Sequence, residues 1–227
     1  ALELHYVNGI LTIVVAASRG RNPTHRSIVL ISQSDNPMGP YQLAGKAAPK
    51  DDYWAIDMTY LEHNNQLYAV WSGWEHKRGK NRQNIYIALM DSPWSICSER
   101  VCLSVPEHHW ETSVWAVNEG PQILKKDGQL IGIVYSANAS WAYDYTQGLI
   151  MYQGGDLLNK SSWKKLNEPI SDPNVGHLSF FKHPESGQDW VAYHQKTKTK
   201  YGWKDRVIRA RAIEWHPENI PNLKFSN

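Results

Sequence analysis

Gln122-Ile123-Leu124 runs into Asp127-Gly128 and returns as Leu130-Ile131-Gly132-Ile133-Val134-Tyr135, and this stretch contains the unit from which the fold is built. Two apolar runs joined by Asp-Gly are typical of a β-hairpin, because both turn residues tolerate the left-handed backbone that a tight reversal requires. The stretch therefore predicts an antiparallel hairpin over residues 122–135.

The same pattern occurs three more times along the chain. Each copy has an apolar run, a turn pair and a second apolar run, and the turn pairs are Asn8-Gly9, Asn64-Asn65 and Ser186-Gly187. Successive turns lie about 60 residues apart, which fits a four-stranded β-propeller blade with long loops. A β-sandwich would give similar strands without such regular spacing. The sequence therefore predicts an all-β chain containing about four propeller blades.

Length and charge limit the possible classes of function. The 227 residues are 41% hydrophobic, enough for a substantial core, and we expect one domain over residues 1–227. The 24 basic and 22 acidic residues are interspersed and give a net charge of +2. The sequence has no dominant cluster of positive charge that would favour binding to nucleic acid or to an anionic membrane. No apolar run approaches the roughly 18 residues of a membrane-spanning helix. We expect neither partner.

The aromatic content is unusual, with eleven Trp and twelve Tyr against three Phe. Trp and Tyr combine a flat apolar face with a polar group, which suits the faces of sugar rings. A β core rich in Trp explains the composition equally well. Cys97 and Cys102 are the two cysteines, and their spacing permits either a local disulfide or two reduced thiols.

A polar residue stands just before the first strand of every hairpin: Glu3, Asp57, Glu119 and His177. The first strand of a propeller blade lines the central channel, so we expect these residues to converge near the axis. Asp57 and Glu119 would then form a carboxylate pair. Glycoside hydrolysis needs a carboxyl group that protonates the leaving oxygen, and a nearby carboxylate raises its pKa. Considered one at a time, the two acids have structural alternatives: Asp57 could be a turn residue, and Glu119 could be a buried hydrogen-bonding group.

Four segments carry a resemblance to a known family: Trp54-Ala55-Ile56-Asp57, Tyr68-Ala69-Val70-Trp71-Ser72-Gly73, Val117-Asn118-Glu119-Gly120-Pro121 and Gly176-His177-Leu178-Ser179-Phe180. In order and spacing the chain resembles glycoside hydrolase family 43, from Leu2 to about Trp215. The nearest likeness is to its α-L-arabinofuranosidase and exo-arabinanase-like members. The resemblance implies a five-bladed β-propeller that hydrolyses arabinose- or xylose-containing plant polysaccharides with inversion of configuration.

The resemblance also implies roles for individual residues. Glu119 would be the general acid, and Asp57 would raise its pKa and orient it. His177 matches a central histidine often found near calcium or another cation, so a structural Ca²⁺ is expected there, with no cofactor required. Arg209 matches an arginine near the sugar hydroxyls in the last blade, although a surface charge on a strand is the alternative.

Further candidates for substrate binding are Trp74, Trp115, Asn118 and Ser136, with Trp141 as a weaker stacking candidate. Each Trp could instead belong to the core. Leu178 departs from the family pattern, which commonly has a polar residue after the histidine, and this predicts an altered substrate pocket.

One departure concerns the general base, which in the family is an aspartate of the first blade, upstream of the segment that begins at Ala1. Asp51 and Asp52 lie in a linker and are poor substitutes. We expect that the N-terminal blade is missing from residues 1–227, or that the protein binds sugars without cleaving them. The sequence thus predicts a secreted, monomeric glycosidase, with a non-catalytic carbohydrate-binding propeller as the alternative. A protein-interaction scaffold is disfavoured, since it needs no paired acids.

Overall fold

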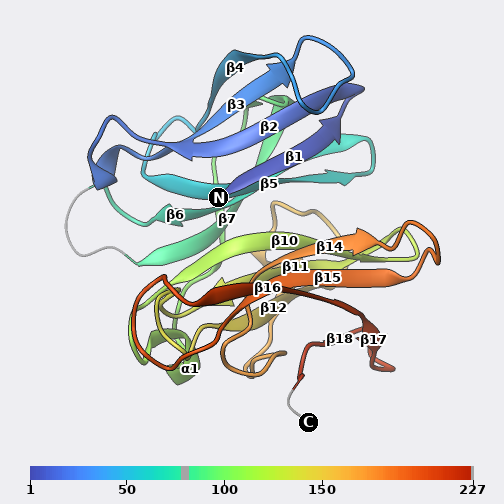
Figure 1. The fold of residues 1–227 in the computed structure, drawn as a ribbon. Coiled ribbons are helices and arrows are strands. Elements are labelled where there is room, and N and C mark those ends of the chain that lie inside the picture. The colour runs from blue at the N-terminus through green and yellow to red at the C-terminus, as the bar shows by residue number, and fades with distance from the viewer. Residues whose placement is uncertain (78–81, 226–227) are drawn as a thin grey trace.

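The computed structural model describes residues 1–77 and 82–225, which are built mainly from antiparallel strands (Figure 1). Helical segments in these residues are short: η1 (Asn22–Thr24), α1 (His109–Thr112) and η2 (Lys160–Ser162). In the described part of the chain, no helix has the length and apolarity needed to cross a membrane.

The first blade is a four-stranded sheet in the order β1-β2-β3-β4. Its strands are β1 (Leu2–Val7), β2 (Ile10–Ala17), β3 (Arg26–Ser32) and β4 (Tyr41–Ala47). Asn8 and Gly9 join β1 to β2 with φ of 51° and 77°, the left-handed backbone that a two-residue hairpin needs. The pairing of β1 with β2 runs without a register shift from Leu2 to Val7.

The second and third blades follow the same antiparallel order. The second contains β5 (Ala55–His63), β6 (Gln66–Trp74), β7 (Gln83–Ser92), β8 (Ser95–Ile96) and β9 (Val101–Ser104), where β8 and β9 both pair with β7. The third contains β10 (Asn118–Lys126), β11 (Gln129–Ala137), β12 (Thr146–Tyr152) and β13 (Trp163–Lys165). Asn64-Asn65 and Asp127-Gly128 form the predicted turns.

The fourth blade has three strands, β14 (Gly176–Lys182), β15 (Asp189–Lys196) and β16 (Arg206–Ala212), in that order. A separate hairpin of β17 (Glu214–Trp215) and β18 (Pro221–Asn222) follows. The connection between β14 and β15 spans residues 183–188 and includes the predicted turn pair Ser186-Gly187.

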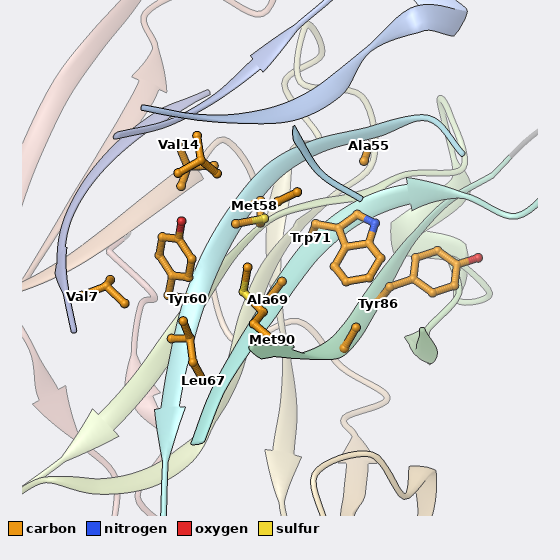
Figure 2. Packing of buried hydrophobic residues seen from close by; sticks show 13 residues of the cluster. Val7, Val14, Ala55, Met58, Tyr60, Leu67, Ala69, Trp71, Tyr86 and Met90 are labelled. Carbon is orange, nitrogen blue, oxygen red and sulfur yellow. The ribbon is translucent and has the colours of Figure 1, made fainter. Parts of the chain in front are cut away.

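Three hydrophobic clusters hold neighbouring blades together. Between the first and second blades, Val7 and Val14 pack with Met58, Tyr60 and Trp71 (Figure 2). Corresponding clusters join the second blade to the third and the third to the fourth. Each blade thus shares a hydrophobic cluster with each of its neighbours, as the stacking of propeller blades requires.

The outer face of the first blade, defined by Leu2, Leu4, Tyr6 and Leu43, is exposed. Their exposed fractions are 61%, 47%, 68% and 68%. Leu4 and Leu43 lie in one cross-strand row, because Leu4 pairs with Ile13, Ile13 with Leu30, and Leu30 with Leu43. In Figure 1 the sheet of the first blade, β1–β4, is at the top. No described residue covers most of this apolar row.

The prediction of an all-β chain with four propeller blades is confirmed. The first strand of each predicted hairpin is the first strand of a blade. The two alternatives for the cysteines are also resolved, because Cys97 and Cys102 are both free thiols in the structure.

Candidate active site

A cavity of about 540 Å³ lies where β5, β10 and β14 begin. The predicted residues Asp57, Glu119 and His177 all line it, although 62 and 58 positions of sequence separate neighbouring members. The other lining residues are Ala1, Ile56, Ser140, Tyr145, Ser179, Ala192, Tyr193, His194, Arg206 and Ile208. Three of the four residues expected to converge therefore do so.

The three strands share an irregularity at the cavity. Their pairing with the next strand shifts between Ile56 and Thr59, between Glu119 and Gln122, and between Gly176 and Ser179. At these shifts Asp57, Gly120 and His177 have φ of 54°, 53° and 48°. Left-handed backbone is uncommon for residues other than glycine, and β-bulges commonly redirect side chains next to active sites. Because of these bulges, the side chains of residues 57, 119 and 177 point in other directions than they would on a regular strand.

Glu3, the fourth residue of the predicted set, behaves differently. It sits in the regular part of β1 and accepts hydrogen bonds from Gln122 Nε2 and His5 Nε2. It is not among the residues that line the cavity. Convergence therefore holds for the three bulged strands and not for β1.

Asp57 is almost fully buried, with 4% of its surface exposed. Its Oδ2 accepts a hydrogen bond from the Gly120 backbone N–H at 3.2 Å, which ties β5 to the strand that carries Glu119. This hydrogen bond holds the carboxylate in place at the cavity wall.

Glu119 combines partial burial with a neighbouring negative charge. Burial, and next the charge of Asp57, raise the pKa of Glu119 to about 7. The hydrogen bond from Tyr145 and the positive charge of Arg206 oppose this increase. A carboxyl group with this pKa carries its proton up to neutral pH, and it can donate that proton to a bound molecule.

Tyr145 positions the Glu119 carboxyl group. Its hydroxyl donates to Glu119 Oε1 at 2.8 Å. Its ring stacks on His194, with centroids 5.7 Å apart and planes 8° apart. Gly176 lies directly against the same ring, and a Cβ atom added at this glycine would be 2.2 Å from Tyr145 Cδ1. Only glycine at position 176 leaves room for Tyr145 in this orientation.

Two polar atoms near the cavity have no hydrogen-bond partner among the described residues: His194 Nδ1 and Arg206 Nε. Both side chains line the cavity, and Arg206 Nη2 donates to the Ser140 carbonyl at 2.6 Å. Burial, then the positive charge of Arg206, lowers the pKa of His194 to about 4, so its ring is neutral at pH 7. Buried polar atoms usually have partners, and these two have none among the described residues.

Asn118 and Ser136, both predicted to bind substrate, are fully buried and do not line the cavity. The Asn118 amide donates to Glu111 Oε1 at 2.8 Å, and its oxygen accepts from Ser104 at 2.7 Å. Ser136 Oγ accepts from the His177 backbone N–H at 3.0 Å. These two side chains support the residues next to them, Glu119 and His177, from within the third blade.

The other predicted binding residues also lie outside the cavity lining. Arg209 is exposed on β16, while Trp74 stacks on Trp54 at 5.0 Å. Trp115 is 57% exposed and lies in the segment before β10. Leu178 is 2% exposed and packs in the core between the third and fourth blades, so its side chain does not shape the cavity.

Sequence reasoning missed Arg206, Tyr145 and His194. Residues three apart on a strand point to opposite faces, so choosing Arg209 necessarily selected the face of β16 away from Arg206. The Val207-Ile208-Arg209-Ala210 pattern gave no sign of the strand's orientation. Tyr145 and His194 occur in segments without a recognisable motif, and only their three-dimensional contacts identify them.

His177 was expected near a cation. Within the described ranges, no three His, Cys, Asp or Glu side chains form a group that could hold a metal ion. A cation beside His177 would therefore need backbone or water oxygens for most of its ligands. The cation beside His177 therefore remains a prediction.

Comparison with protein families gives a match to the model of glycosyl hydrolases family 43 over residues 1–221. The chain is 27% identical to alpha-L-arabinofuranosidase 43 of Humicola insolens, over 98% of this chain and 49% of that protein. It is also 27% identical to an extracellular exo-alpha-(1->5)-L-arabinofuranosidase of Streptomyces chartreusis, over 86% of this chain and 62% of that protein. The chain thus spans about half to three fifths of these relatives.

Among solved structures, the alpha-L-arabinofuranosidase from Lactobacillus brevis aligns with a TM-score of 0.91 and 30% identity. The alignment covers 100% of this chain and 76% of that chain. A thermostable family-43 glycoside hydrolase aligns with a TM-score of 0.79 and 22% identity, over 96% of this chain and 72% of the other, which supports the fold alone.

Proposed function

The chain belongs to glycosyl hydrolases family 43, and from that premise we propose that it carries the acid half of an inverting glycosidase site. In this proposal the substrates are plant polysaccharides with terminal α-L-arabinofuranosyl residues, or alternatively β-xylosyl residues. The arabinofuranosidases with which the chain aligns favour arabinose. Glu119 is the general acid, and burial together with the Asp57 charge keeps it protonated.

The observation that carries the proposal is the pairing of Glu119 with Asp57 in one cavity. Burial and the Asp57 charge raise the pKa of Glu119 to about 7, as a proton donor at neutral pH requires. Tyr145 holds Oε1 of Glu119 in a fixed direction. His194 and Arg206 line the same cavity, and polar side chains of these types are suited to sugar hydroxyls.

The proposed reaction begins with a terminal sugar bound in the cavity. Glu119 transfers its proton to the glycosidic oxygen as the bond from that oxygen to the anomeric carbon breaks. A water molecule attacks the anomeric carbon from the opposite face, and a second carboxylate takes a proton from this water. The products are a free sugar with inverted configuration and a polysaccharide shortened by one unit. Proton transfer through water then restores both carboxyl groups.

The second carboxylate must come from elsewhere. Asp57 and Glu119 are the acidic residues that line the cavity in the described part of the chain. We assign the base to a part of the protein outside residues 1–227. The exposed apolar row on the outer face of the first blade offers a surface on which such a part could pack. The relatives' greater length is consistent with this assignment.

A non-catalytic carbohydrate-binding propeller is the second candidate. One observation favours it: the described cavity contains the acid and its modulator but no separate carboxylate to serve as base. Such a protein would bind arabinan or xylan fragments in the same cavity and leave them intact.

The test uses the full-length protein with 4-nitrophenyl α-L-arabinofuranoside, 4-nitrophenyl β-xyloside and arabino-oligosaccharides. The proposal expects release of arabinose, with proton NMR showing that the first-formed sugar has the inverted configuration. Binding of oligosaccharides by calorimetry without any turnover would favour the second candidate. Retention of configuration would contradict the assignment of an inverting site.

Three further expectations belong to the proposal. Secretion is supported by the word extracellular in the names of the Streptomyces relatives. A monomeric state and a structural cation near His177 are carried forward as predictions. Size-exclusion chromatography with light scattering, and metal analysis of the purified protein, test them.

A further inference from the structure

Three tryptophans form a continuous aromatic cluster beside the cavity: Trp115, Trp141 and Trp203. The ring centroids of Trp115 and Trp141 are 6.5 Å apart, and those of Trp141 and Trp203 are 5.5 Å apart. They come from three different connections, before β10, between β11 and β12, and between β15 and β16. The fold therefore gathers residues from two blades into one surface.

The outer members of this cluster are unusually exposed. Trp115 is 57% exposed and Trp203 is 64% exposed, while Trp141 between them is half-buried. Tyr201, two residues before Trp203, is 63% exposed. Side chains that leave most of their surface in water contribute little to the core, and grouped exposed aromatics commonly mark binding surfaces. Packing of the loops accounts for Trp141 and does not account for the outer two.

The cluster is tied directly to the cavity wall through Ser140. Trp203 Nε1 donates to Ser140 Oγ at 3.3 Å, and Arg206 donates to the Ser140 carbonyl at 2.6 Å. Ser140 and Arg206 both line the cavity. The Gly202 N–H donates to the Trp141 carbonyl at 2.9 Å, which joins the two loops. The aromatic surface thus begins at the rim of the cavity that contains Glu119.

The geometry points to a bent polysaccharide-binding platform formed by Trp115, Trp141 and Trp203, in which the planes of neighbouring rings are inclined by 54° and 65°. It would hold sugar units of the chain that lie beyond the bond cleaved in the cavity. The C–H faces of sugar rings are apolar, and Trp offers the largest flat face with little rotational entropy to lose. The platform rests on the proposed function, because the location of the cleaved bond follows from the role of Glu119.

The ligand is a neutral chain of pentose rings, and two sources share this chemistry: an arabinan and an arabinoxylan. Affinity gel electrophoresis with each polysaccharide in turn distinguishes them. The protein used is the full-length Glu119→Gln variant, which leaves the polymer uncut during the run. We expect retardation by at least one of the two polymers.

The decisive variant adds Trp115→Ala and Trp203→Ala to this protein, and the matched control adds Trp115→Phe and Trp203→Phe. Because truncating aromatic anchors commonly costs over tenfold in affinity, the alanine pair should weaken retardation by about tenfold or more. The phenylalanine pair keeps flat rings and should retain most of it. Equal retardation of the alanine pair and its parent would overturn the platform, and so would a parent that neither polymer retards.

A second measurement needs no substitution and so does not depend on the folding of a variant. N-bromosuccinimide oxidises exposed tryptophans, and peptide mapping identifies which ones react. Saturating arabino-oligosaccharide or arabinoxylan fragments should protect Trp115 and Trp203 at least severalfold. Unchanged oxidation of both residues would overturn the platform. The proposed function fails separately, if the wild-type protein binds these sugars but releases none.

Discussion

The first strands of the four blades look alike in sequence but not in structure. β1 pairs with β2 in unbroken register, and its acidic residue, Glu3, accepts a hydrogen bond from Gln122 of the third blade. β5, β10 and β14 each contain a bulge with a left-handed residue, and their polar side chains meet in the cavity. The difference shows that an acid at the start of a blade is insufficient for this site. A local break in the strand is also needed.

The largest expected effect separates the acid of a bulged strand from the acid of the regular strand. Glu119→Gln should lower kcat/KM on arabino-oligosaccharides by about 10²- to 10⁴-fold, the usual contribution of general acid catalysis. The loss should be much smaller on 4-nitrophenyl arabinofuranoside, whose leaving group needs little protonation. Steady-state kinetics on both substrates measures this.

Glu3→Gln is the matched control, since it makes the same change in β1. It should leave kcat/KM within a few-fold of wild type. Equal losses for the two variants would remove the distinction between the bulged and regular strands.

The next effect concerns Asp57, whose charge raises the pKa of Glu119. Asp57→Asn keeps a side chain that tolerates left-handed backbone but removes the charge. The pKa of Glu119 should fall, so the acid loses its proton at lower pH and the alkaline limb of kcat/KM moves down. At pH 7 we expect a loss of about tenfold or more. A pH profile of hydrolysis measures both changes.

Asp52→Asn is the control for backbone conformation. Asp52 also has a left-handed backbone, with φ of 46°, but its carboxylate bonds to Arg26 and Lys46 away from the cavity. The alkaline limb should stay in place in this variant. An unchanged limb in Asp57→Asn as well would refute the role given to Asp57.

Gly120→Ala tests the bulge itself. Its φ of 53° disfavours any Cβ, and the new atom would lie 3.0 Å from His177 Nδ1. We expect the free energy of unfolding to fall by about 2 kcal/mol or more, from backbone strain and crowding together. Activity should also fall, because the adjacent Glu119 is displaced. Thermal or urea unfolding and kinetics provide the two readouts.

Gly9→Ala is the corresponding change in the first blade. Gly9 has φ of 77° and no atom within 4 Å of an added Cβ, so only backbone strain of about 1–2 kcal/mol is expected. Its activity, measured under conditions where the variant is folded, should match wild type. If the two alanine variants behaved identically in stability and activity, the bulge would have no special role.

The smallest effect is expected for Tyr145→Phe. The Tyr145 hydroxyl donates to the Glu119 carboxylate and so favours its ionised form. Its removal should raise the pKa of Glu119 and move the alkaline limb to higher pH, the reverse of Asp57→Asn. The rate should change only a few-fold, in line with one lost hydrogen bond.

Tyr135→Phe serves as its control, because the buried Tyr135 hydroxyl donates to a different carboxylate, Glu111, at 2.9 Å. This variant should lose stability without moving the alkaline limb. A shift of the same size in both variants would indicate a general loosening of the third blade.

Much of the fold was predictable from the hairpins, since Asn-Gly and Asp-Gly turns between apolar runs define a strand pair locally. The meeting of Asp57, Glu119 and His177 followed from their shared place in the repeat. The bulges were not predictable, because Asp57 and His177 take left-handed backbone inside apolar runs, without the Asn-Gly or Asp-Gly pairs that mark the turns. Arg206 and Tyr145 could not be identified either, since contacts between distant loops place them at the cavity.

The central claim is that burial and the charge of Asp57 together keep Glu119 protonated, and direct titration of Glu119 tests it. Carbon NMR of protein labelled at the glutamate carboxyl carbons, with the Glu119 signal assigned by its loss in Glu119→Gln, follows this group across pH. The account predicts an apparent pKa of about 7 in the wild-type protein and a lower one in Asp57→Asn. A Glu119 that titrates in the ordinary glutamate range in both proteins would contradict it.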